Sequence, residues 1–293
     1  MIRYYGDIYR PPSEAESLIL QATIGCSHNR CAFCVAYQNK RFRARRENEL
    51  LAEIDWAGEN LSGVKRVFLA DGDAFVLSAE RLHKILQRLY LRLPSLERVS
   101  AYASPQNIAA KSDEDLRRLR QAGLQLLYYG LESGDDEVLS RIQKGADAEE
   151  IVRQARRAQE AGFELSVTVI LGLAGPKGSE RHARATARCL DRIRPRWAAA
   201  LTLMLAPRRP SYPEVYGDPA WRPLAPAESL CECRLLLESM QADGITFRSN
   251  HASNYLALKG ELQRDKARML ELIDQALSDP HSPLWRPEFL RAL

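Results

Sequence analysis

The stretch Cys26-Ser-His-Asn-Arg-Cys31-Ala-Phe-Cys34 places three cysteines within nine residues, directly after an apolar segment. Thiolate sulfur is the ligand of iron–sulfur clusters, and a cluster of four irons ordinarily takes four protein thiolates. Three thiolates would leave one iron open to a small molecule. The same cysteines could instead join His28 in a tetrahedral zinc site. Their clustering disfavours unrelated core thiols, and nothing marks the chain as secreted, which disfavours a disulfide.

The composition is that of a globular chain. Its 293 residues are 45% apolar and 27% charged, a length that suits one large α/β domain or a domain with an appendage. A net charge of +4 does not by itself indicate a nucleic-acid partner. No run reaches the roughly 18 apolar residues of a membrane span, and the beginning, MIRYYGDIYRPP, has no signal-peptide core. We therefore expect a cytoplasmic protein with no membrane partner.

Apolar segments typical of strands alternate with segments of helical periodicity up to residue 205. Ser78 and Ser112 are suited to cap two of the helices, and Gly123 and Gly162 follow the ends of two others. The expected strands are 18–24, 65–70, 98–103, 125–129, 165–171 and 197–205. Such alternation predicts a parallel sheet with helices on both sides. Six repeats favour a partial (β/α)6 TIM-type barrel over an open doubly wound sheet.

The two ends of the chain differ from this middle part. Pro11-Pro12 bars regular structure near the N-terminus, and six prolines fall between Pro207 and Pro226. Two further helices are expected at about 227–241 and 261–278. The predicted parts are an N-terminal extension (1–17), a partial barrel (18–205), and a proline-rich linker with a helical C-terminal lid (206–293).

With the cysteine loop after the first strand and six α/β repeats behind it, the chain resembles the radical S-adenosylmethionine (SAM) superfamily over about 20–205. The phrase Tyr129-Gly-Leu-Glu-Ser-Gly134, followed by Asp135-Asp-Glu-Val-Leu139, is similar to the branch of coproporphyrinogen dehydrogenase and the Elp3/MiaB-type catalytic domains. Phe33 matches the aromatic position of the family's cluster loop. The spacing is CX4CX2C, whereas the family usually has three residues between the first two cysteines.

The resemblance implies a [4Fe–4S] cluster held by Cys26, Cys31 and Cys34, whose open iron chelates the amino and carboxylate groups of SAM. It implies an oxidoreductase or transferase that cleaves SAM reductively. The resulting 5′-deoxyadenosyl radical would then take a hydrogen atom from a substrate. An electron donor such as flavodoxin or ferredoxin is implied as a partner.

The SAM contacts implied by the resemblance all follow expected strands, at the end where barrel folds place their sites. Ala70-Asp-Gly-Asp73 stands where the family has a Gly-Gly-Glu motif for the SAM amino group, and a carboxylate can accept a hydrogen bond from an ammonium. Glu132 is alternatively a helix-capping carboxylate, and 170–175 is alternatively an ordinary buried strand with a turn. The implied contacts are Phe33, Asp71, Gly72, Asp73, Glu132, Ser133, Ile170, Gly172, Leu203 and Met204.

Two polar stretches bear on the substrate. Lys40–Arg46 holds five cations in seven residues, either as a clamp for carboxylates or phosphates or as a solvated face. Arg248–Asn254 is rich in donors and acceptors, or is a turn that caps the last helix. We expect an anionic small molecule, contacted by Arg43, Arg45, Arg248, Asn250 and His251, the last a candidate proton donor. The alternatives are an RNA-modifying radical SAM enzyme and a non-catalytic zinc- or cluster-binding carrier.

Overall fold

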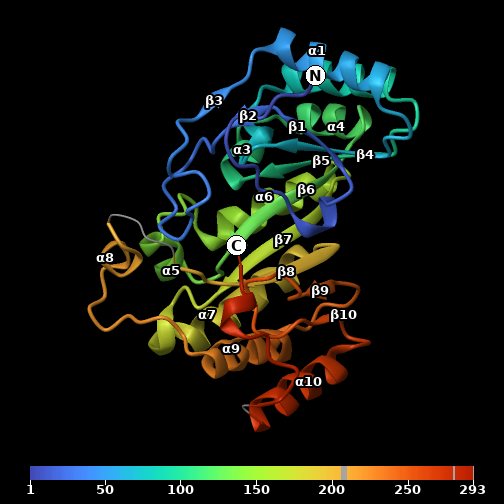
Figure 1. Cartoon of the computed structure of the whole chain (residues 1–293). Coiled ribbons are helices and arrows are strands. Elements are labelled where there is room, and N and C mark those ends of the chain that lie inside the picture. Colours follow the sequence, from blue (N-terminus) through green and yellow to red (C-terminus); the bar gives the residue numbers. More distant parts are fainter. Residues whose placement is uncertain (206–209, 280, 293) are drawn as a thin grey trace. The chain divides into compact units, whose positions relative to one another are not determined.

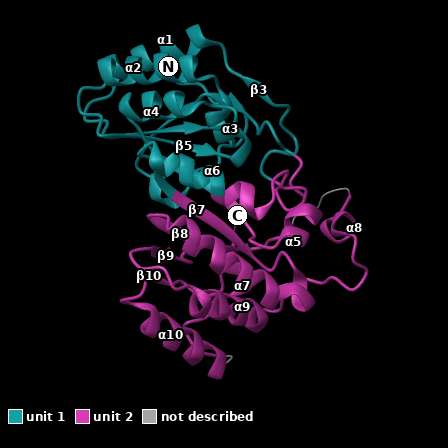
Figure 2. Ribbon diagram, turned by 180° about the vertical axis from the view of Figure 1, so that it is seen from behind, with its two compact units in different colours: residues 1–29, 36–129, 153–165 teal, residues 30–35, 130–152, 166–293 magenta. Residues whose placement is uncertain are grey.

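The computed structural model describes residues 1–205, 210–279 and 281–292, so Pro207 of the predicted linker lies outside the described residues. The chain divides into two compact units, which Figure 2 shows in different colours. Unit 1 comprises residues 1–29, 36–129 and 153–165, and unit 2 comprises residues 30–35, 130–152 and 166–293. Each unit is described by itself.

Parallel strands form the centre of unit 1 (Figure 1). In hydrogen-bonded order they are β1 (Leu18–Gln21), β4 (Arg66–Ala70), β5 (Arg98–Ala103) and β6 (Leu124–Glu132), the last continuing into unit 2. The run Val67-Phe-Leu-Ala70 is fully buried. A continuous apolar run of this kind is typical of a parallel strand that is covered on both faces.

Two helices of unit 1 begin after the serines that the sequence predicts as caps. The Ser78 hydroxyl accepts a hydrogen bond from the Arg81 N–H at 3.3 Å, and Ser112 forms a capping box with Asp115, which confirms both predicted caps. The helices are α1 (Glu47–Asn60), α2 (Ala79–Arg92), α3 (Pro105–Ala109), α4 (Asp113–Gln121) and most of α6 (Ala148–Glu160).

A short two-stranded ribbon closes the base of the cysteine loop. Strand β2 (Thr23–Ile24) pairs antiparallel with β3 (Arg43–Ala44), so that the residues before and after the loop are hydrogen-bonded to each other. The predicted first strand is therefore divided, because β1 ends at Gln21 and the chain then leaves the main sheet.

The N-terminal extension is held in place by a buried carboxylate. Pro12–Glu14 forms a 3-10 turn, and the Glu14 side chain is fully buried. Arg98 donates to Glu14 Oε1 at 2.7 Å, and the Tyr128 hydroxyl donates to the same oxygen at 2.6 Å. Such a network compensates the cost of burying the charge and anchors the extension to strands β5 and β6.

Unit 2 contains the remaining strands and the C-terminal helices. Strands β7 (Glu164–Leu171), β8 (Trp197–Thr202) and β9 (Thr246–Arg248) are parallel, and β10 (Lys259–Glu261) runs antiparallel to β9. The helices are α5 (Asp136–Arg141), α7 (Gly175–Ile193), α8 (Tyr212–Tyr216), α9 (Pro226–Ser239) and α10 (Lys266–Ser278). Pro287 is followed by the 3-10 turn Glu288–Leu290.

The strand order is β1-β4-β5-β6-β7-β8-β9-β10, which follows the chain without a reversal. A doubly wound sheet would reverse its order at a switch point, whereas the sequential order agrees with the predicted TIM-type barrel. Three of the described strands were not predicted, because β3 has two residues and β9 and β10 have three each, too few for a periodic signal. The predicted polar stretch Arg248–Asn254 thus begins at the last residue of a strand.

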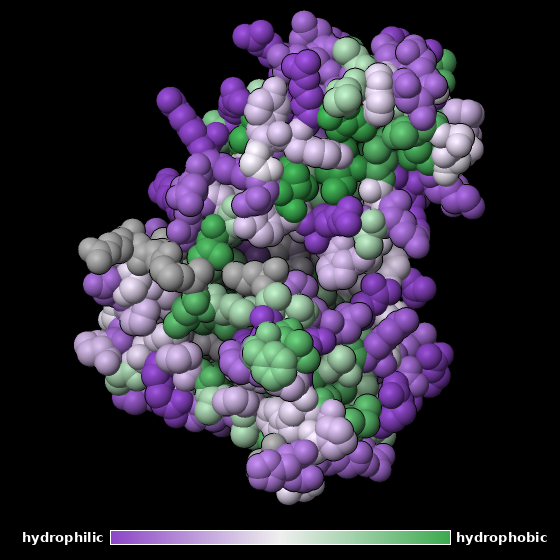
Figure 3. All heavy atoms as spheres, viewed as in Figure 1, coloured by the Kyte–Doolittle hydropathy of each residue, from purple (hydrophilic) through white to green (hydrophobic). Residues whose placement is uncertain are grey.

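No helix within residues 1–205, 210–279 and 281–292 is long and apolar enough to cross a membrane. On the face shown in Figure 3, hydrophilic side chains are spread over both units, with apolar side chains between them.

Candidate functional site

The cysteine loop leaves β2 through Gly25. Its φ is +74°, and an added Cβ would lie 3.1 Å from the Lys40 carbonyl oxygen, so this turn favours glycine. Further along, the Cys34 N–H donates to the Cys31 carbonyl at 3.1 Å, and the buried Ala32 donates to Ile142 at 2.9 Å. These backbone bonds fix the second half of the loop.

Cys26, Cys31 and Cys34 are partly exposed and are not in disulfides, and Phe33 and His28 are partly exposed as well. Within the described part of the chain, no three His, Cys, Asp or Glu side chains are gathered as ligands of one metal ion. The cluster assignment therefore depends on the spacing of the thiols along the chain.

Asp71 follows β4 directly and is fully buried in unit 1. Its Oδ2 accepts hydrogen bonds from Gln21 (3.3 Å) and the Gly25 N–H (3.1 Å), and forms an ion pair with Lys40 (2.9 Å). Its Oδ1 has no hydrogen-bond partner among the described residues. A buried acceptor without a partner is rare in folded proteins, so this oxygen needs an explanation.

Asp73 repeats this arrangement two residues later. Its Oδ2 accepts from both the N–H and the hydroxyl of Ser27, and its Oδ1 has no partner among the described residues. Burial raises the pKa of Asp73, opposed by Ser27, Asn107 and the charge of Lys111. Gly72 lies between the two aspartates, where an added Cβ would approach the ring of Tyr37 to 2.2 Å.

Glu132 ends β6 in a left-handed conformation, with φ at +63°. Its carboxylate is buried and pairs with Lys144 at 2.9 Å. Asp135, and not Glu132, caps the next helix by accepting from the Glu137 N–H at 3.0 Å, so the capping alternative for Glu132 is wrong. Strained backbone at a non-glycine residue tends to occur at functional sites.

Ser133 belongs to a buried network that the sequence analysis did not identify. Its hydroxyl lies 2.8 Å from His182 Nδ1, and His182 Nε2 lies 3.1 Å from the Ile170 carbonyl. A carbonyl only accepts, so Nε2 carries a hydrogen. Glu232 of α9 lies 3.6 Å from Nε2 and accepts from the Gly172 N–H at 2.7 Å. This network fixes the turns that follow β6 and β7.

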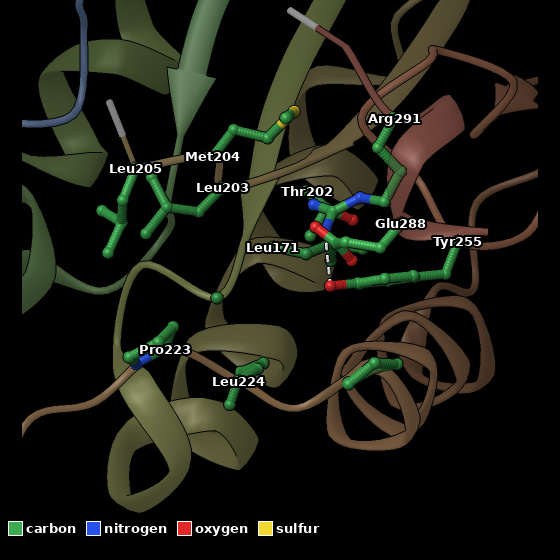
Figure 4. Close-up of a pocket in the computed structure, with 12 residues that line it drawn as sticks. Leu171, Thr202, Leu203, Met204, Leu205, Pro223, Leu224, Tyr255, Glu288 and Arg291 are labelled. Atoms are coloured by element: carbon green, nitrogen blue, oxygen red, sulfur yellow. Dashed lines mark hydrogen bonds and ion pairs between the residues drawn. The ribbon is translucent and has the colours of Figure 1, made fainter. Parts of the chain in front are cut away.

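A pocket of about 350 Å³ lies at the carboxyl ends of β7 and β8 in unit 2 (Figure 4). Gly172, Leu203 and Met204, three of the SAM contacts implied by the resemblance, line it. Ile170 does not, and its carbonyl is bonded to His182 instead. The other lining residues are Leu171, Thr202, Leu205, Pro223, Leu224, Pro226, Tyr255, Glu288 and Arg291.

The C-terminal segment supplies the charged part of this pocket. Arg291 forms an ion pair with Glu288 at 2.7 Å. Its guanidinium carbon lies 3.9 Å from the centre of the Tyr255 ring, and its Nη1 donates a hydrogen bond to the Tyr255 hydroxyl. Sequence analysis missed these three residues because no periodicity or motif singles them out.

The three arginines predicted to contact the substrate differ in burial and in their partners. Arg45 is buried and donates to both carboxylate oxygens of Glu53 at 2.8 Å, so its guanidinium is occupied by a structural ion pair. Arg43 is exposed beside the ring of Tyr5. Arg248 lies over the ring of Trp197, and its buried Nε has no partner among the described residues.

The remaining two predicted residues lie in the turn after β9. Asn250 is exposed. Burial and the neighbouring Arg286 lower the pKa of His251, which accepts from the Ser253 N–H at 3.1 Å. A lowered pKa favours the neutral ring, so His251 is poorly suited to the expected role of proton donor at neutral pH.

Comparison with known proteins places these features in a family. The heme chaperone HemW of Bacillus subtilis is 29% identical over 147 residues, which are 50% of this chain and 38% of that protein. The 4′-phospho-dehydrooxetanocin synthase of Priestia megaterium is 23% identical over 173 residues, 53% of this chain and 23% of that protein. The chain thus spans well under half the length of these relatives.

Solved structures show the same fold. The coproporphyrinogen III oxidase HemN of Escherichia coli superposes with a TM-score of 0.56 at 20% identity, covering 76% of this chain and 50% of that one. The model of the radical SAM superfamily matches residues 20–188, more than half of the sequence, and enzymes of that family use a [4Fe–4S] cluster and SAM. The chain belongs to the radical SAM superfamily.

Proposed function

We propose that this radical SAM enzyme cleaves SAM reductively and abstracts hydrogen from a small anionic substrate. The observation that carries the SAM part is the pair of buried carboxylate oxygens, Asp71 Oδ1 and Asp73 Oδ1, that have no partner among the described residues. An ammonium group supplies three donors, and charge-assisted hydrogen bonds to carboxylates are strong. A protein that only carried zinc or a cluster would have no use for such acceptors.

The roles of the other residues follow from their chemistry. Cys26, Cys31 and Cys34 would hold the cluster as thiolates. When bound, the cluster and SAM together supply one-electron cleavage and a hydrogen-abstracting species. Gly172, Leu203 and Met204 offer an apolar pocket in unit 2 to the nucleoside part of SAM.

Further contacts of this chain are part of the same proposal. Glu132, Ser133, Phe33 and Gly72 keep the SAM-contacting roles implied by the resemblance. For the substrate we retain Arg43, Arg248 and Asn250, and leave out Arg45 and His251 for the reasons given above. A one-electron reductant is needed, for which we propose a flavodoxin or a ferredoxin.

The test is anaerobic reconstitution followed by reaction with SAM and a reductant. We expect about four irons per chain and formation of 5′-deoxyadenosine, both lost in Cys34→Ala. Cys189→Ala is the matched control, because Cys189 is buried in α7 and outside the cysteine loop. One zinc per chain without iron would refute the proposal. Stoichiometric binding of haem without any 5′-deoxyadenosine would instead favour a carrier, as the name of the HemW relative suggests.

A further inference from the structure

Two buried side chains of α7 hold the turn that follows β6 in unit 2. Ser133 Oγ lies 2.8 Å from His182 Nδ1, and the Gly134 N–H donates to the Thr186 hydroxyl at 2.9 Å. His182 and Thr186 are one helical turn apart, so both lie on the same face of α7. The turn approaches this helix so closely that an added Cβ on Gly134 would lie 2.3 Å from the Ala185 carbonyl oxygen. The position of the turn therefore depends on α7.

A carboxylate of α9 connects α7 to the turn that follows β7. The Glu232 side chain is fully buried, and His182 Nε2 lies 3.6 Å from its Oε1. Glu232 accepts hydrogen bonds from the Gly172 N–H at 2.7 Å and from the Ser179 hydroxyl. Helices α7 and α9 lie side by side in Figures 1 and 2. One side chain thus links the turn after β7 to the helix that holds the turn after β6.

The distribution of polar residues along α9 favours a role beyond packing. Its buried residues near the C-terminal end, Leu236 and Leu237, are apolar, as expected for a helix that packs on its neighbours. Burial of a carboxylate costs free energy that burial of leucine does not. The buried polar residues of α9 are Ser229 and Glu232, and Ser229 Oγ lies 3.4 Å from the hydroxyl of Thr202, the last residue of β8. Both therefore lie beside the ends of strands, where the proposed SAM contacts are.

We propose that Glu232 is a positioning residue for SAM binding: it holds the turns that carry Gly172 and Ser133, and thereby fixes the SAM contacts proposed for these two residues. Glu232 itself does not touch SAM. Turns that are already fixed spare SAM the free energy of ordering them. The inference rests on the proposed function and adds to it a determinant from α9, which lies beyond residue 188, where the match to the family model ends.

Two substitutions separate the length of the Glu232 side chain from its carboxylate. Glu232→Gln keeps the length, so its carbonyl oxygen can accept from Gly172 while its amide donates to Ser179. Glu232→Asp keeps a carboxylate but is one methylene shorter. Equilibrium binding of SAM to the reconstituted full-length chain, without reductant, should weaken about tenfold in Glu232→Asp, as expected for one lost hydrogen bond, and less than about threefold in Glu232→Gln.

A third variant removes only a partner of the carboxylate, and a fourth is the control. Ser179→Ala takes away the hydroxyl that orients Glu232, and should weaken SAM binding by about threefold. Leu236→Ala removes a buried side chain from the same helix, away from the polar network. It should lower the urea midpoint of unfolding because it leaves a cavity, while SAM affinity stays within about twofold of wild type. Iron content should equal that of wild type in all four variants.

Hydrogen exchange tests the positioning itself without SAM. In Glu232→Asp the Gly172 N–H and the peptides covering residues 130–136 should exchange faster than in wild type, whereas Glu232→Gln should keep the protection. The inference is overturned if Glu232→Asp binds SAM as wild type does, if Leu236→Ala weakens SAM binding equally, or if exchange at both turns is unchanged. A wild type that binds no SAM would refute the proposed function and the SAM role of Glu232 together, and the exchange result would still decide whether Glu232 holds the turns.

Discussion

The carboxylates of unit 1 and the pocket of unit 2 differ in how charge is placed. Asp71 and Asp73 are buried, are held by fixed donors, and each has one oxygen without a partner among the described residues. In the pocket, charge comes from Glu288 and Arg291, whose pair is neutral as a whole and lies beside aliphatic side chains. The first arrangement concentrates negative charge on buried oxygens, and the second places a pair of opposite charges beside an apolar pocket.

The largest expected effect is the loss of stability when Asp71 of unit 1 is removed. Asp71→Ala would leave Lys40, whose side chain is 13% exposed, without its carboxylate. Removing one partner of a buried pair costs about 3–5 kcal/mol, so the free energy of unfolding in urea should fall by this amount. Asp71→Asn should cost less, because the amide still accepts hydrogen bonds from Gln21 and Gly25. A loss of less than about 1 kcal/mol in Asp71→Ala, the range of an exposed pair, would contradict a stabilising role for the buried ion pair.

The second prediction uses Lys111, which is buried near Asp73. Burial lowers the pKa of Lys111 to about 8, while its ammonium donates to the Phe75 carbonyl at 2.6 Å. The folded state then binds fewer protons than the unfolded state between pH 8 and the ordinary lysine pKa, so stability should rise with pH across this window. The rise should reach about 3 kcal/mol relative to Lys111→Met. If the free energies of unfolding of wild type and Lys111→Met changed with pH in parallel, the lowered pKa of Lys111 would be contradicted.

The third prediction concerns the pH dependence of SAM binding. Because burial raises the pKa of Asp73 above its ordinary 3.8, this carboxylate becomes protonated at a higher pH than an exposed one. A protonated carboxyl binds an ammonium less well, so SAM affinity should fall about tenfold as the pH drops through the raised pKa. The fall should vanish in Asp73→Asn. Its persistence in that variant would assign the titration to another group.

The smallest expected change in stability comes from breaking the ion pair between Glu288 and Arg291 in unit 2. Glu288 is mostly exposed, and exposed ion pairs contribute about 0–1 kcal/mol to stability. Glu288→Ala should therefore change the free energy of unfolding by less than about 1 kcal/mol. A loss of stability as large as that of Asp71→Ala would mean that the folded state depends on Glu288. The contrast between the buried carboxylates of unit 1 and the exposed carboxylate of unit 2 would then be lost.

Much of this architecture is readable in the sequence, because parallel strands and amphipathic helices leave strong periodic patterns. The cysteine spacing and the carboxylates after β4 were also identified, since each follows an apolar strand directly. Three groups were missed: the short strands β3, β9 and β10, the pair His182 and Glu232, and the C-terminal residues Glu288 and Arg291. Their significance arises only from contacts between segments far apart in the chain, such as Glu232 with Gly172.

The cationic run 40–46 shows what charge along the sequence leaves open. Five positive charges in seven residues suggest a clamp for an anion. In the structure, Lys40 pairs with Asp71 and Arg45 with Glu53, so two of the five stabilise buried carboxylates. Charge density along a chain does not show which cations will find partners within the fold.

The most direct test of the central claim compares SAM with its deaminated analogue, in which the amino group of the methionine part is replaced by hydrogen. If Asp71 and Asp73 hold the ammonium, the reconstituted wild type should bind SAM ten- to a hundredfold more tightly than the analogue. In Asp73→Asn the difference should shrink markedly while the iron content stays at the wild-type level. Equal affinity of wild type for the two ligands would contradict the account.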